Sequence, residues 1–126
     1  MKIVKTSKAP AAIGPYSQAV ICNGFIFTSG QIAINPETGA LVDNNIKSEI
    51  TQVIQNLDKI LIEAGSSLSK IVKLNVYLKN LDDFTILNSV FEKTFKEDHY
   101  PARSTFEVSN LPKNVNIEID AVAELE

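Results

Sequence analysis

The sequence has few of the residues that most often build metal centres or disulfides. It contains one cysteine, one histidine and no tryptophan among its 126 residues. With Cys22 alone, no intramolecular disulfide can form and no cluster of thiolates can hold zinc. Cys22 follows the apolar Ala19–Ile21, so we expect a buried, unreactive thiol. The single imidazole, His99, disfavours a histidine-based metal site, and we expect it on the surface near a helix end.

Long apolar runs and clustered positive charge are also absent. No stretch approaches the roughly 18 apolar residues of a membrane span, and Met1–Pro10 lacks the apolar run of a signal peptide. The 12 basic and 15 acidic residues give a net charge of −3, without a basic stripe that would neutralise phosphates. The sequence therefore predicts a cytoplasmic protein and disfavours nucleic acid as its partner.

The composition is that of an ordinary globular protein. Hydrophobic residues make up 44% and charged residues 21%, and no repeat or low-complexity tract interrupts the chain. A chain of this length buries roughly two-thirds of the surface that its unfolded form exposes, which is enough for one sizeable core. We predict a single domain over residues 1–126.

Turn signals divide the first third of the chain into short extended segments. Asn23-Gly24 accepts the positive φ angles of a tight turn and separates Ser17–Cys22 from Phe25–Gly30, which predicts a β-hairpin. Pro36–Gly39 predicts a second turn after Gln31–Asn35.

Two helices are predicted from the spacing of apolar residues. From Ile46 to Ala64 these residues recur at the helical period for about five turns, and Gly65 suits a left-handed cap. A second helix, at about Asp82–Lys96, is predicted to bury one stripe formed by Phe84, Leu87, Phe91 and Phe95. Asn88 falls on the same stripe, and a buried amide without a partner costs about 1–3 kcal/mol. We therefore expect this amide to hydrogen-bond either another part of the protein or a ligand.

Three later segments alternate between apolar and polar residues, as strands with one buried face do. They are Ile71–Leu78, Ala102–Val108 and Val115–Leu125. In the first, the expected core side carries Val72, Leu74, Val76 and Leu78, and the other side Lys73, Asn75 and Tyr77. In the second, Arg103, Thr105 and Glu107 are expected to oppose Ala102, Ser104, Phe106 and Val108. In the third, the polar side carries Asn116, Glu118, Asp120 and Glu124.

The order of these elements predicts an α+β fold. Strands, a helix, a strand, a second helix and a terminal hairpin follow one another, and right-handed crossovers lay both helices on one face of the sheet. The other face would be uncovered and mostly polar, with Ile71, Tyr77 and Val122 also on it. This mixture favours a subunit interface that contains a wet cleft.

The candidate site lies on this uncovered face. If the terminal hairpin pairs, Arg103 and Thr105 lie beside Glu118 and Asp120 of the next strand. An arginine fork holds a carboxylate by two parallel hydrogen bonds, and a nearby carboxylic acid moves a proton or orients a water. The alternative is structural: Arg103, the sole arginine, pairs with Glu118 or Glu107 and holds the sheet together.

Two further segments are candidates for contact with a ligand. Ala9–Tyr16 contains two prolines and a glycine, so it forms a stiff arm that ends in a phenol. Tyr16 either packs against the protein or lines a site. Ser29-Gly30 ends a hairpin strand, where a glycine lets backbone N–H groups approach a ligand, although turn geometry explains it equally well.

Several motifs occur in one order along the chain, namely Ala9–Ala19, Thr28–Ile32, Pro101–Thr105, Leu111–Lys113 and Ile117–Ala123. Through them the chain resembles, from end to end, the reactive-intermediate deaminase family, also called RidA, YjgF or L-PSP. The resemblance implies a chorismate-mutase-like α+β subunit, a relative of the ferredoxin-like fold, with a mixed six-stranded sheet and two helices on one face. It also implies a homotrimer with ligand clefts between adjacent subunits.

The resemblance further implies an activity. Such proteins hydrolyse enamines and imines such as 2-aminoacrylate and 2-aminocrotonate, released by pyridoxal-phosphate-dependent dehydratases, to 2-keto acids and ammonia without a metal or organic cofactor. By resemblance, Arg103 would grip the substrate carboxylate, and Glu118 would orient the attacking water or relay its proton. The residues expected to line the cleft are Tyr16, Ser29, Gly30, Asn88 and Thr105. Some members have cysteine in place of Thr105, so a thiol is not required here.

Two other functions stay open at this point. A trimer that kept the cleft but lost turnover would bind small carboxylates as a regulator, and the presence of Glu118 argues against it. Ribonuclease or translation inhibitor is a label also attached to this family. The acidic balance of the chain and the lack of a basic groove argue against that activity.

Overall fold

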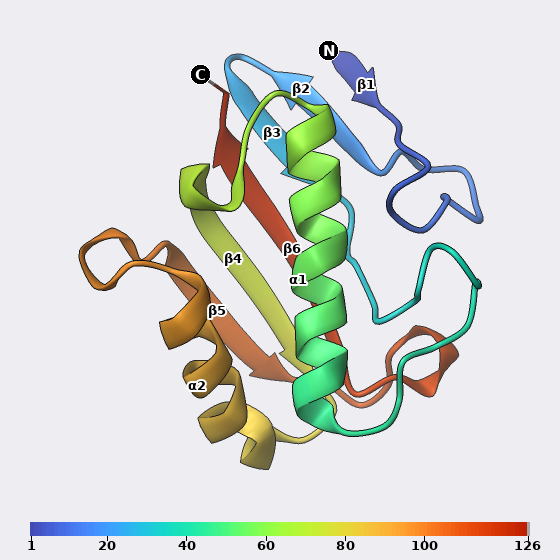
Figure 1. Cartoon of the computed structure of the whole chain (residues 1–126), viewed down its shortest axis with the longest axis vertical. Helices are drawn as coiled ribbons and strands as arrows, with labels where there is room; N and C mark the ends of the chain where they lie inside the picture. The colour runs from blue at the N-terminus through green and yellow to red at the C-terminus, as the bar shows by residue number, and fades with distance from the viewer. Residues whose placement is uncertain (126) are drawn as a thin grey trace.

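The computed structural model describes residues 1–125, which form one six-stranded mixed sheet with two α-helices packed on one side (Figure 1). The strands are β1 (Lys2–Val4), β2 (Ala19–Cys22), β3 (Phe25–Thr28), β4 (Ile71–Leu78), β5 (Ala102–Glu107) and β6 (Ile117–Glu124), and the helices are α1 (Ile46–Glu63) and α2 (Phe84–Thr94). Short 3₁₀ turns occur at Leu68–Lys70, Leu81–Asp83, Glu97–His99 and Pro112–Asn114. The strand order is β1-β2-β3-β6-β4-β5. The predicted α+β class, the six strands and the placement of both helices are confirmed.

The first hairpin forms where the sequence predicts it. Strands β2 and β3 pair antiparallel, with Cys22 opposite Phe25. The turn between them uses positive φ angles of 51° at Asn23 and 80° at Gly24. Asparagine and glycine accept such angles at low cost, so this dipeptide fixes the register of the hairpin.

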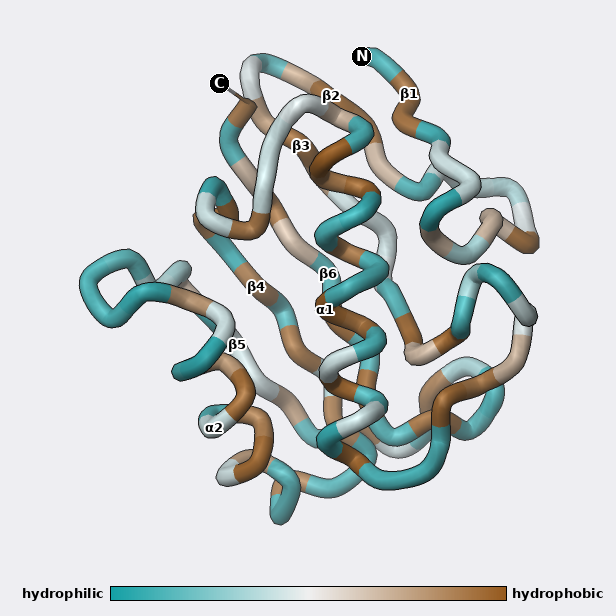
Figure 2. Tube along the Cα trace, viewed as in Figure 1, coloured by the Kyte–Doolittle hydropathy of each residue, from teal (hydrophilic) through white to brown (hydrophobic). Residues whose placement is uncertain are grey.

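Helix α1 is the main cover of the sheet. Its start is capped by Asn45, whose side-chain oxygen accepts a hydrogen bond from Ser48 N at 2.9 Å. Gly65, just beyond its end, has a φ of 89°, as predicted for the cap. Hydrophobic positions recur along α1 (Figure 2), and the buried ones are Ile50, Val53, Ile54, Leu57, Ile60 and Leu61. They pack on the buried faces of β3, β4 and β6, and this contact forms the core.

Helix α2 begins later than predicted. Its first residue is Phe84, because Asn80 caps the preceding 3₁₀ turn by accepting from Asp82 N at 2.8 Å. Leu87, Phe91 and Phe95 are buried as predicted. The prediction is wrong for Phe84, which is 38% exposed. It lies at the helix start, where the ring extends past the edge of the core.

A β-bulge in β4 reverses two side chains relative to the prediction. The register of β4 against β6 shifts between Ile71 and Lys73. Val72 is therefore 37% exposed and Ile71 is buried, whereas simple alternation places them the other way round. From Leu74 to Leu78 the expected alternation holds.

The predicted terminal hairpin does not form. Strand β4 lies between β5 and β6, parallel to the former and antiparallel to the latter. The crossover through α2 places β5 parallel to β4, so β5 takes the outer edge, and the chain must return to the inner side of β4 to add β6. The turn-like Asn110–Lys113 thus belongs to a longer connection that passes around the end of β4.

The predictions for the single cysteine and the single histidine have different outcomes. Cys22 is exposed, which corrects the prediction of a buried thiol. Strand alternation is the reason, since Ala19 faces the helices and Cys22, three residues on, faces away. His99 is exposed in the 3₁₀ turn after α2, as predicted.

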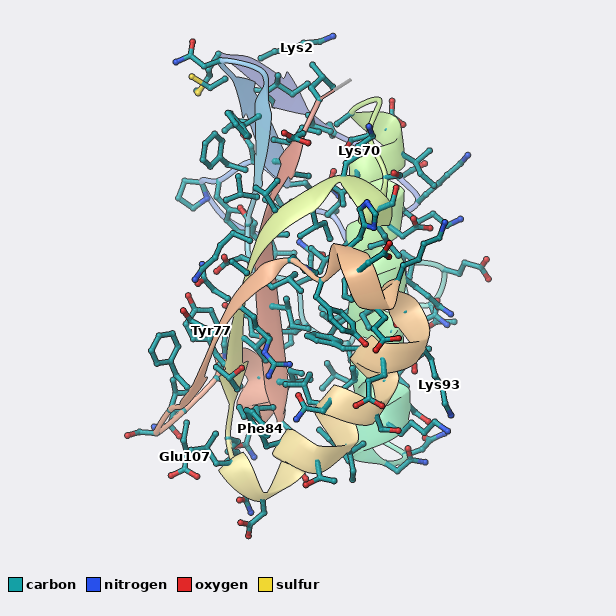
Figure 3. All side chains as sticks on the ribbon, turned by 90° about the vertical axis from the view of Figure 1, so that its left-hand side faces the viewer. Lys2, Lys70, Tyr77, Phe84, Lys93 and Glu107 are labelled. Carbon is teal, nitrogen blue, oxygen red and sulfur yellow. The ribbon has the colours of Figure 1, made fainter. Side chains whose placement is uncertain are left out.

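No helix within residues 1–125 covers the sheet face opposite α1 and α2 (Figure 3). Figure 3 shows the sheet from its β5 edge, with both helices on one side and Tyr77 on the other. Exposed apolar residues on that face include Ile3, Phe27 and Phe106. Polar groups lie among them, so the predicted mixed character of the face is confirmed, although Ile71 is not part of it. No helix within residues 1–125 is long and apolar enough to cross a membrane.

One buried amide holds the irregular segment after β3. Asn56, 1% exposed on α1, donates hydrogen bonds to Ile32 O at 3.2 Å and Ile34 O at 3.0 Å. This segment contains only isolated bridges, such as the one that joins Ile34 to Leu41. Asn56 therefore replaces a strand partner for these backbone groups.

We predict that Asn56→Ala lowers the free energy of unfolding by roughly 1–3 kcal/mol, because a buried carbonyl loses its donor. Urea denaturation followed by circular dichroism measures this change. Gln55→Ala, on the exposed side of the same helix, is the control and should stay within about 0.5 kcal/mol of the unchanged protein. An equally small effect of Asn56→Ala would contradict the role of this amide.

Candidate functional site

The predicted site residues form two groups on opposite faces of the sheet. Residues paired across neighbouring strands point to the same face. Arg103 pairs with Leu74, which is buried beneath the helices, so Arg103 faces the helices. Glu118 pairs with Tyr77 and therefore faces the uncovered side.

Three expectations about the uncovered face are therefore wrong. Arg103 and Thr105 do not lie beside Glu118 and Asp120, because β4 separates the two strands and the two pairs face opposite ways. The charged residues do not gather on a single side of the sheet. The alternation of residues in β5 shows which side chains share a face, but not which of the two faces lies under the helices. Phe106, expected on the core side, is therefore on the other side and is 49% exposed.

Arg103 is held by an amide and two aromatic rings. Its Nη1 donates to Asn88 Oδ1 at 2.8 Å, which identifies the partner that this amide requires. Its guanidinium carbon lies 5.1 Å from the ring centre of Phe84 and 5.5 Å from that of Phe91, both cation–π distances. Burial lowers the pKa of Arg103 from its ordinary value. The guanidinium nevertheless stays charged at neutral pH.

Within residues 1–125, no carboxylate forms an ion pair with Arg103. The carboxylate of Glu107 instead accepts a hydrogen bond from Leu81 N at 2.9 Å. The structural alternative, in which Arg103 pairs with Glu118 or Glu107, is therefore wrong. A guanidinium carries five N–H donors, so most of them are available to a ligand.

A cavity of about 370 Å³ opens beside Arg103, between α2 and the sheet. It is lined by Leu74, Asn88, Phe91, Glu92, Phe95, Tyr100, Pro101 and Arg103. Thr105 lies on the same face of β5, two residues from Arg103. Its hydroxyl is buried and has no hydrogen-bond partner in the described part of the chain. An unpaired buried hydroxyl is costly, so it is a ready donor or acceptor for a ligand.

The second group is centred on Glu118. Backbone hydrogen bonds of 2.8 Å and 3.1 Å join Gln31 and Ile119 and bring Gly30 against the Glu118 side chain. A Cβ at Gly30 would overlap the carboxylate, with Glu118 Cδ only 2.7 Å away. The missing side chain at Gly30 therefore lets the Glu118 carboxylate lie in this position, and no positive φ angle at Gly30 accounts for the glycine. Burial, and then the charge of Asp120, raise the pKa of Glu118 above its ordinary value of 4.5.

Asp120 connects Glu118 to β4. It accepts hydrogen bonds from Asn75 Nδ2 at 2.8 Å and from Tyr77 Oη at 3.2 Å. Burial raises the pKa of Tyr77, and the neighbouring charge of Asp120 raises it further. Tyr77 lies directly opposite Glu118 across the two strands. The two carboxylates and the phenol thus form one coupled group on the uncovered face.

The arm that ends at Tyr16 borders Glu118. Gln18, 3% exposed, fixes the arm through hydrogen bonds to Thr6 N at 2.7 Å and Pro10 O at 2.8 Å. The hydroxyl of Tyr16 accepts from Ile13 N at 3.4 Å, and its ring is 49% exposed. A second cavity of about 140 Å³ is lined by Tyr16, Gly30, Glu118, Gln31, Ile32, Lys113 and parts of the arm.

The hydroxyl of Ser29 already donates a hydrogen bond within the protein, so its role is to hold the chain beside Gly30 in place. Its Oγ donates to Ser17 O at 2.5 Å, and its backbone N–H donates to Gln18 O at 2.9 Å. These bonds join the end of β3 to the start of β2, next to Gly30. Its hydroxyl proton is therefore engaged within the chain.

Sequence reasoning missed several residues of the two cavities. Phe84 was expected in the core but lies against the guanidinium. Lys113 lines the second cavity with a φ of 54°, an angle that few residues other than glycine adopt. A single sequence predicts neither the contact of Phe84 with Arg103 nor the position of Lys113, because both depend on the path of the connections that follow β4 and β5.

The sequence model of a family described as "Endoribonuclease L-PSP" matches residues 6–125. The human protein named 2-iminobutanoate/2-iminopropanoate deaminase is 42% identical, over 97% of this chain and 88% of that protein. The chain belongs to this L-PSP family, which confirms the resemblance.

Solved structures agree with this assignment. RidA from an Antarctic Psychrobacter superposes with a TM-score of 0.94 at 41% identity, covering 99% of this chain and 100% of that one. E. coli TdcF, solved with bound serine, gives a TM-score of 0.93 at 37% identity and covers 100% of both chains. The agreement over the full length shows that the arm, both helices and the strand order are those of the family.

The electrostatic coupling on the uncovered face is testable. We predict that Asp120→Asn lowers the pKa of Glu118, because it removes a negative charge near that carboxyl, while burial keeps the pKa above 4.5. The pKa of Tyr77 should fall as well. NMR titration of the carboxyl carbon and of the phenol measures both. Asp98→Asn, an exposed site, is the control, and identical titrations in all three proteins would disprove the coupling.

Proposed function

We propose that this protein hydrolyses reactive 2-enamino and 2-imino acids, such as 2-aminoacrylate and 2-aminocrotonate, to 2-keto acids and ammonia. The observation that carries the proposal is Arg103, a charged guanidinium beside a cavity, held by Asn88 and two rings without a carboxylate partner in the described chain. A small carboxylate is the ligand that such a group binds best. The activity named for the human relative is of this class.

The proposal requires two copies of the chain. Arg103 and Glu118 lie on opposite faces of one sheet, so they act on one ligand only if Glu118 comes from a neighbouring copy. We propose a homotrimer in which Arg103, Asn88 and Thr105 of one subunit face Glu118 and Gly30 of the next. Tyr16 and Ser29 would complete the second half of each cleft.

The uncovered face has the composition of such an interface. Ile3, Val20, Phe27 and Val122 lie in direct register across β1, β2, β3 and β6 and form an apolar row. Ile3 is 61% exposed and Phe27 43%. The stacked rings of Tyr77 and Phe106, 6.0 Å apart, extend the apolar surface beyond β4. A surface of this kind favours association.

The proposed chemistry consists mainly of proton transfers. The enamine takes a proton at C3 and becomes an imine, water adds at C2, and the nitrogen takes a proton and leaves as ammonia. Glu118 as carboxylate would accept the proton of the attacking water, and as carboxylic acid would return one to the nitrogen. Its raised pKa suits this exchange, because a group that changes charge nearer neutral pH serves both as acid and as base.

Ribonuclease activity is the second candidate, and the description of the matching family favours it. The net charge of −3 provides little attraction for a phosphate backbone. Assay of RNA cleavage on the same preparation, with and without Arg103→Ala, tests this candidate. A regulator that only binds small carboxylates would bind 2-keto acids but release no product from an imine.

Mixing two inactive variants tests the shared site. We predict that Arg103→Ala and Glu118→Gln each lose most of the turnover of 2-aminocrotonate. An equal mixture of the two, unfolded and refolded together, should regain about a quarter of the unaltered rate, because one site in four receives both intact groups. Keto acid release, with the imine supplied by a threonine dehydratase, measures the rate.

The control mixes the same variants without unfolding, so that no subunits exchange. Size-exclusion chromatography must show that both variants still assemble. If refolding together restores nothing although assembly is intact, Arg103 and Glu118 do not serve one site between copies. If Arg103→Ala alone keeps the full rate, the guanidinium does not anchor the substrate.

The close approach at Gly30 gives a separate test. We predict that Gly30→Ala lowers turnover about 10²-fold or more, because the new methyl group displaces the Glu118 carboxylate. Gly14→Ala is the matched control, since the nearest atoms, in the ring of Tyr16, would lie 3.4 Å from its Cβ, an ordinary contact. The same enzyme assay and a thermal unfolding curve for each variant make the comparison. Full activity in folded Gly30→Ala would exclude Glu118 from the chemistry.

A further inference from the structure

The cavity beside Arg103 is polar at one end and apolar along its walls. Asn88 and Arg103 form the polar end. From there Phe91 leads to Phe95, which it meets edge to face at 5.6 Å between ring centres. The remaining apolar surface comes from Leu74 on the floor and from Tyr100 and Pro101, just before β5.

The cavity extends along α2 away from Phe84. Phe84 contacts the guanidinium but does not line the cavity, whereas Phe95, three turns further along, does. Phe84 begins α2 (Figure 3), and the hydrogen bond from Leu81 N to Glu107 holds this start of the helix near the last residue of β5. The cavity therefore lies towards the start of β5, and Arg103 stands at its inner end.

In the single chain, before a neighbouring copy contributes its half of the proposed cleft, the cavity has more room than the smallest ligands of the proposed class need. 2-Iminobutanoate has seven non-hydrogen atoms, which fill at most about 210 Å³ at the roughly 30 Å³ that a water molecule takes in the liquid. The cavity measures about 370 Å³, within the range of small-molecule sites. With the carboxylate on Arg103, the side chain of the ligand is the only part that can lie against the apolar walls.

We infer that this cavity holds the substrate side chain, and that the protein prefers 2-imino acids with branched or aromatic apolar side chains, of the size of those of leucine and phenylalanine. This inference rests on the proposed function, because it assigns the substrate class of the same site. Phe95 and Tyr100 are the specificity-determining residues. Both residues line the cavity; Phe95 is buried, and Tyr100 is 49% exposed.

Glu92 also lines the cavity. It is exposed, one turn of α2 beyond Asn88. Its carboxylate disfavours a second acidic group on the ligand. We therefore expect the cavity to favour monocarboxylic ligands over imino acids derived from aspartate or glutamate.

Binding of 2-keto acids, the reaction products, tests the cavity without turnover. Isothermal titration calorimetry compares 2-ketobutyrate, 4-methyl-2-oxopentanoate, phenylpyruvate and 2-oxoglutarate on the unaltered assembly. We expect 4-methyl-2-oxopentanoate and phenylpyruvate to bind at least about tenfold more tightly than 2-ketobutyrate, because each added methylene loses contact with water. We expect 2-oxoglutarate to bind most weakly. Equal dissociation constants for all four would overturn the inference.

Two variants of the cavity lining test which residues produce the preference for large side chains. Tyr100→Ala should weaken the binding of phenylpyruvate about tenfold more than the binding of 2-ketobutyrate, because the cavity loses an aromatic side chain from its lining. Phe95→Leu tests the part of the cavity around Phe95 in the same way. In this variant, the binding of phenylpyruvate is compared only with the binding of 2-ketobutyrate by the same variant. Ile86→Ala, on α2 but outside the cavity, is 37% exposed in the parent protein and should change none of the four constants. If both cavity variants lose the same affinity for large and for small keto acids, the side chain of the ligand does not bind in this cavity.

Turnover separates this inference from the proposed function. Imines of alanine, leucine and phenylalanine, formed in place by an amino-acid oxidase, are followed as ammonia and keto acid. A size preference in binding without acceleration of any imine would support the cavity's role and end the proposed hydrolysis. Acceleration that is greatest for the smallest imine would support hydrolysis and overturn the assignment of the cavity.

Discussion

The position of β4 between β5 and β6 determines how this molecule can act. Because cross-strand neighbours share a face, the parallel pairing of Leu74 with Arg103 directs the guanidinium towards α2. The antiparallel pairing of Tyr77 with Glu118 directs that carboxylate to the opposite face. The single chain therefore keeps a cationic group and a carboxylate with a raised pKa on opposite faces of the sheet. In the proposed function, they serve one ligand only where two copies of the chain meet.

The environment of Arg103 keeps its charge available. An ion pair with Glu107 would have satisfied the guanidinium and left little for a ligand, but Glu107 caps Leu81 N instead. The rings of Phe84 and Phe91 and the oxygen of Asn88 orient the cation without neutralising it. Burial without a counter-charge is costly, and a bound carboxylate would remove that cost. The same arrangement thus leaves the charge of Arg103 available for an anionic ligand.

Local sequence signals predicted the elements that depend on local interactions. Helix α1 and the turn at Asn23-Gly24 follow from periodicity and backbone freedom, and both are confirmed. Asn88 was correctly expected to have a hydrogen-bond partner, although its amide is half-buried rather than buried. The bulge at Val72 and the facing of β5 were not predictable, since each depends on strand register across the sheet. The resemblance to the family supplied the candidate site residues, but not their separation onto two faces of the sheet.

The two halves also explain how proton transfer would be tied to substrate binding. In an empty cleft, Arg103 of one subunit would lower the pKa of Glu118 in the next, against the upward effects of burial and of Asp120. A substrate carboxylate on Arg103 would cancel that positive charge. The upward effects would then be less opposed, so Glu118 would hold the proton that it accepts from the attacking water until the nitrogen takes it. In the proposed assembly this dependence would arise between subunits, because within one chain the charge of Arg103 is not among the causes that shift the pKa of Glu118.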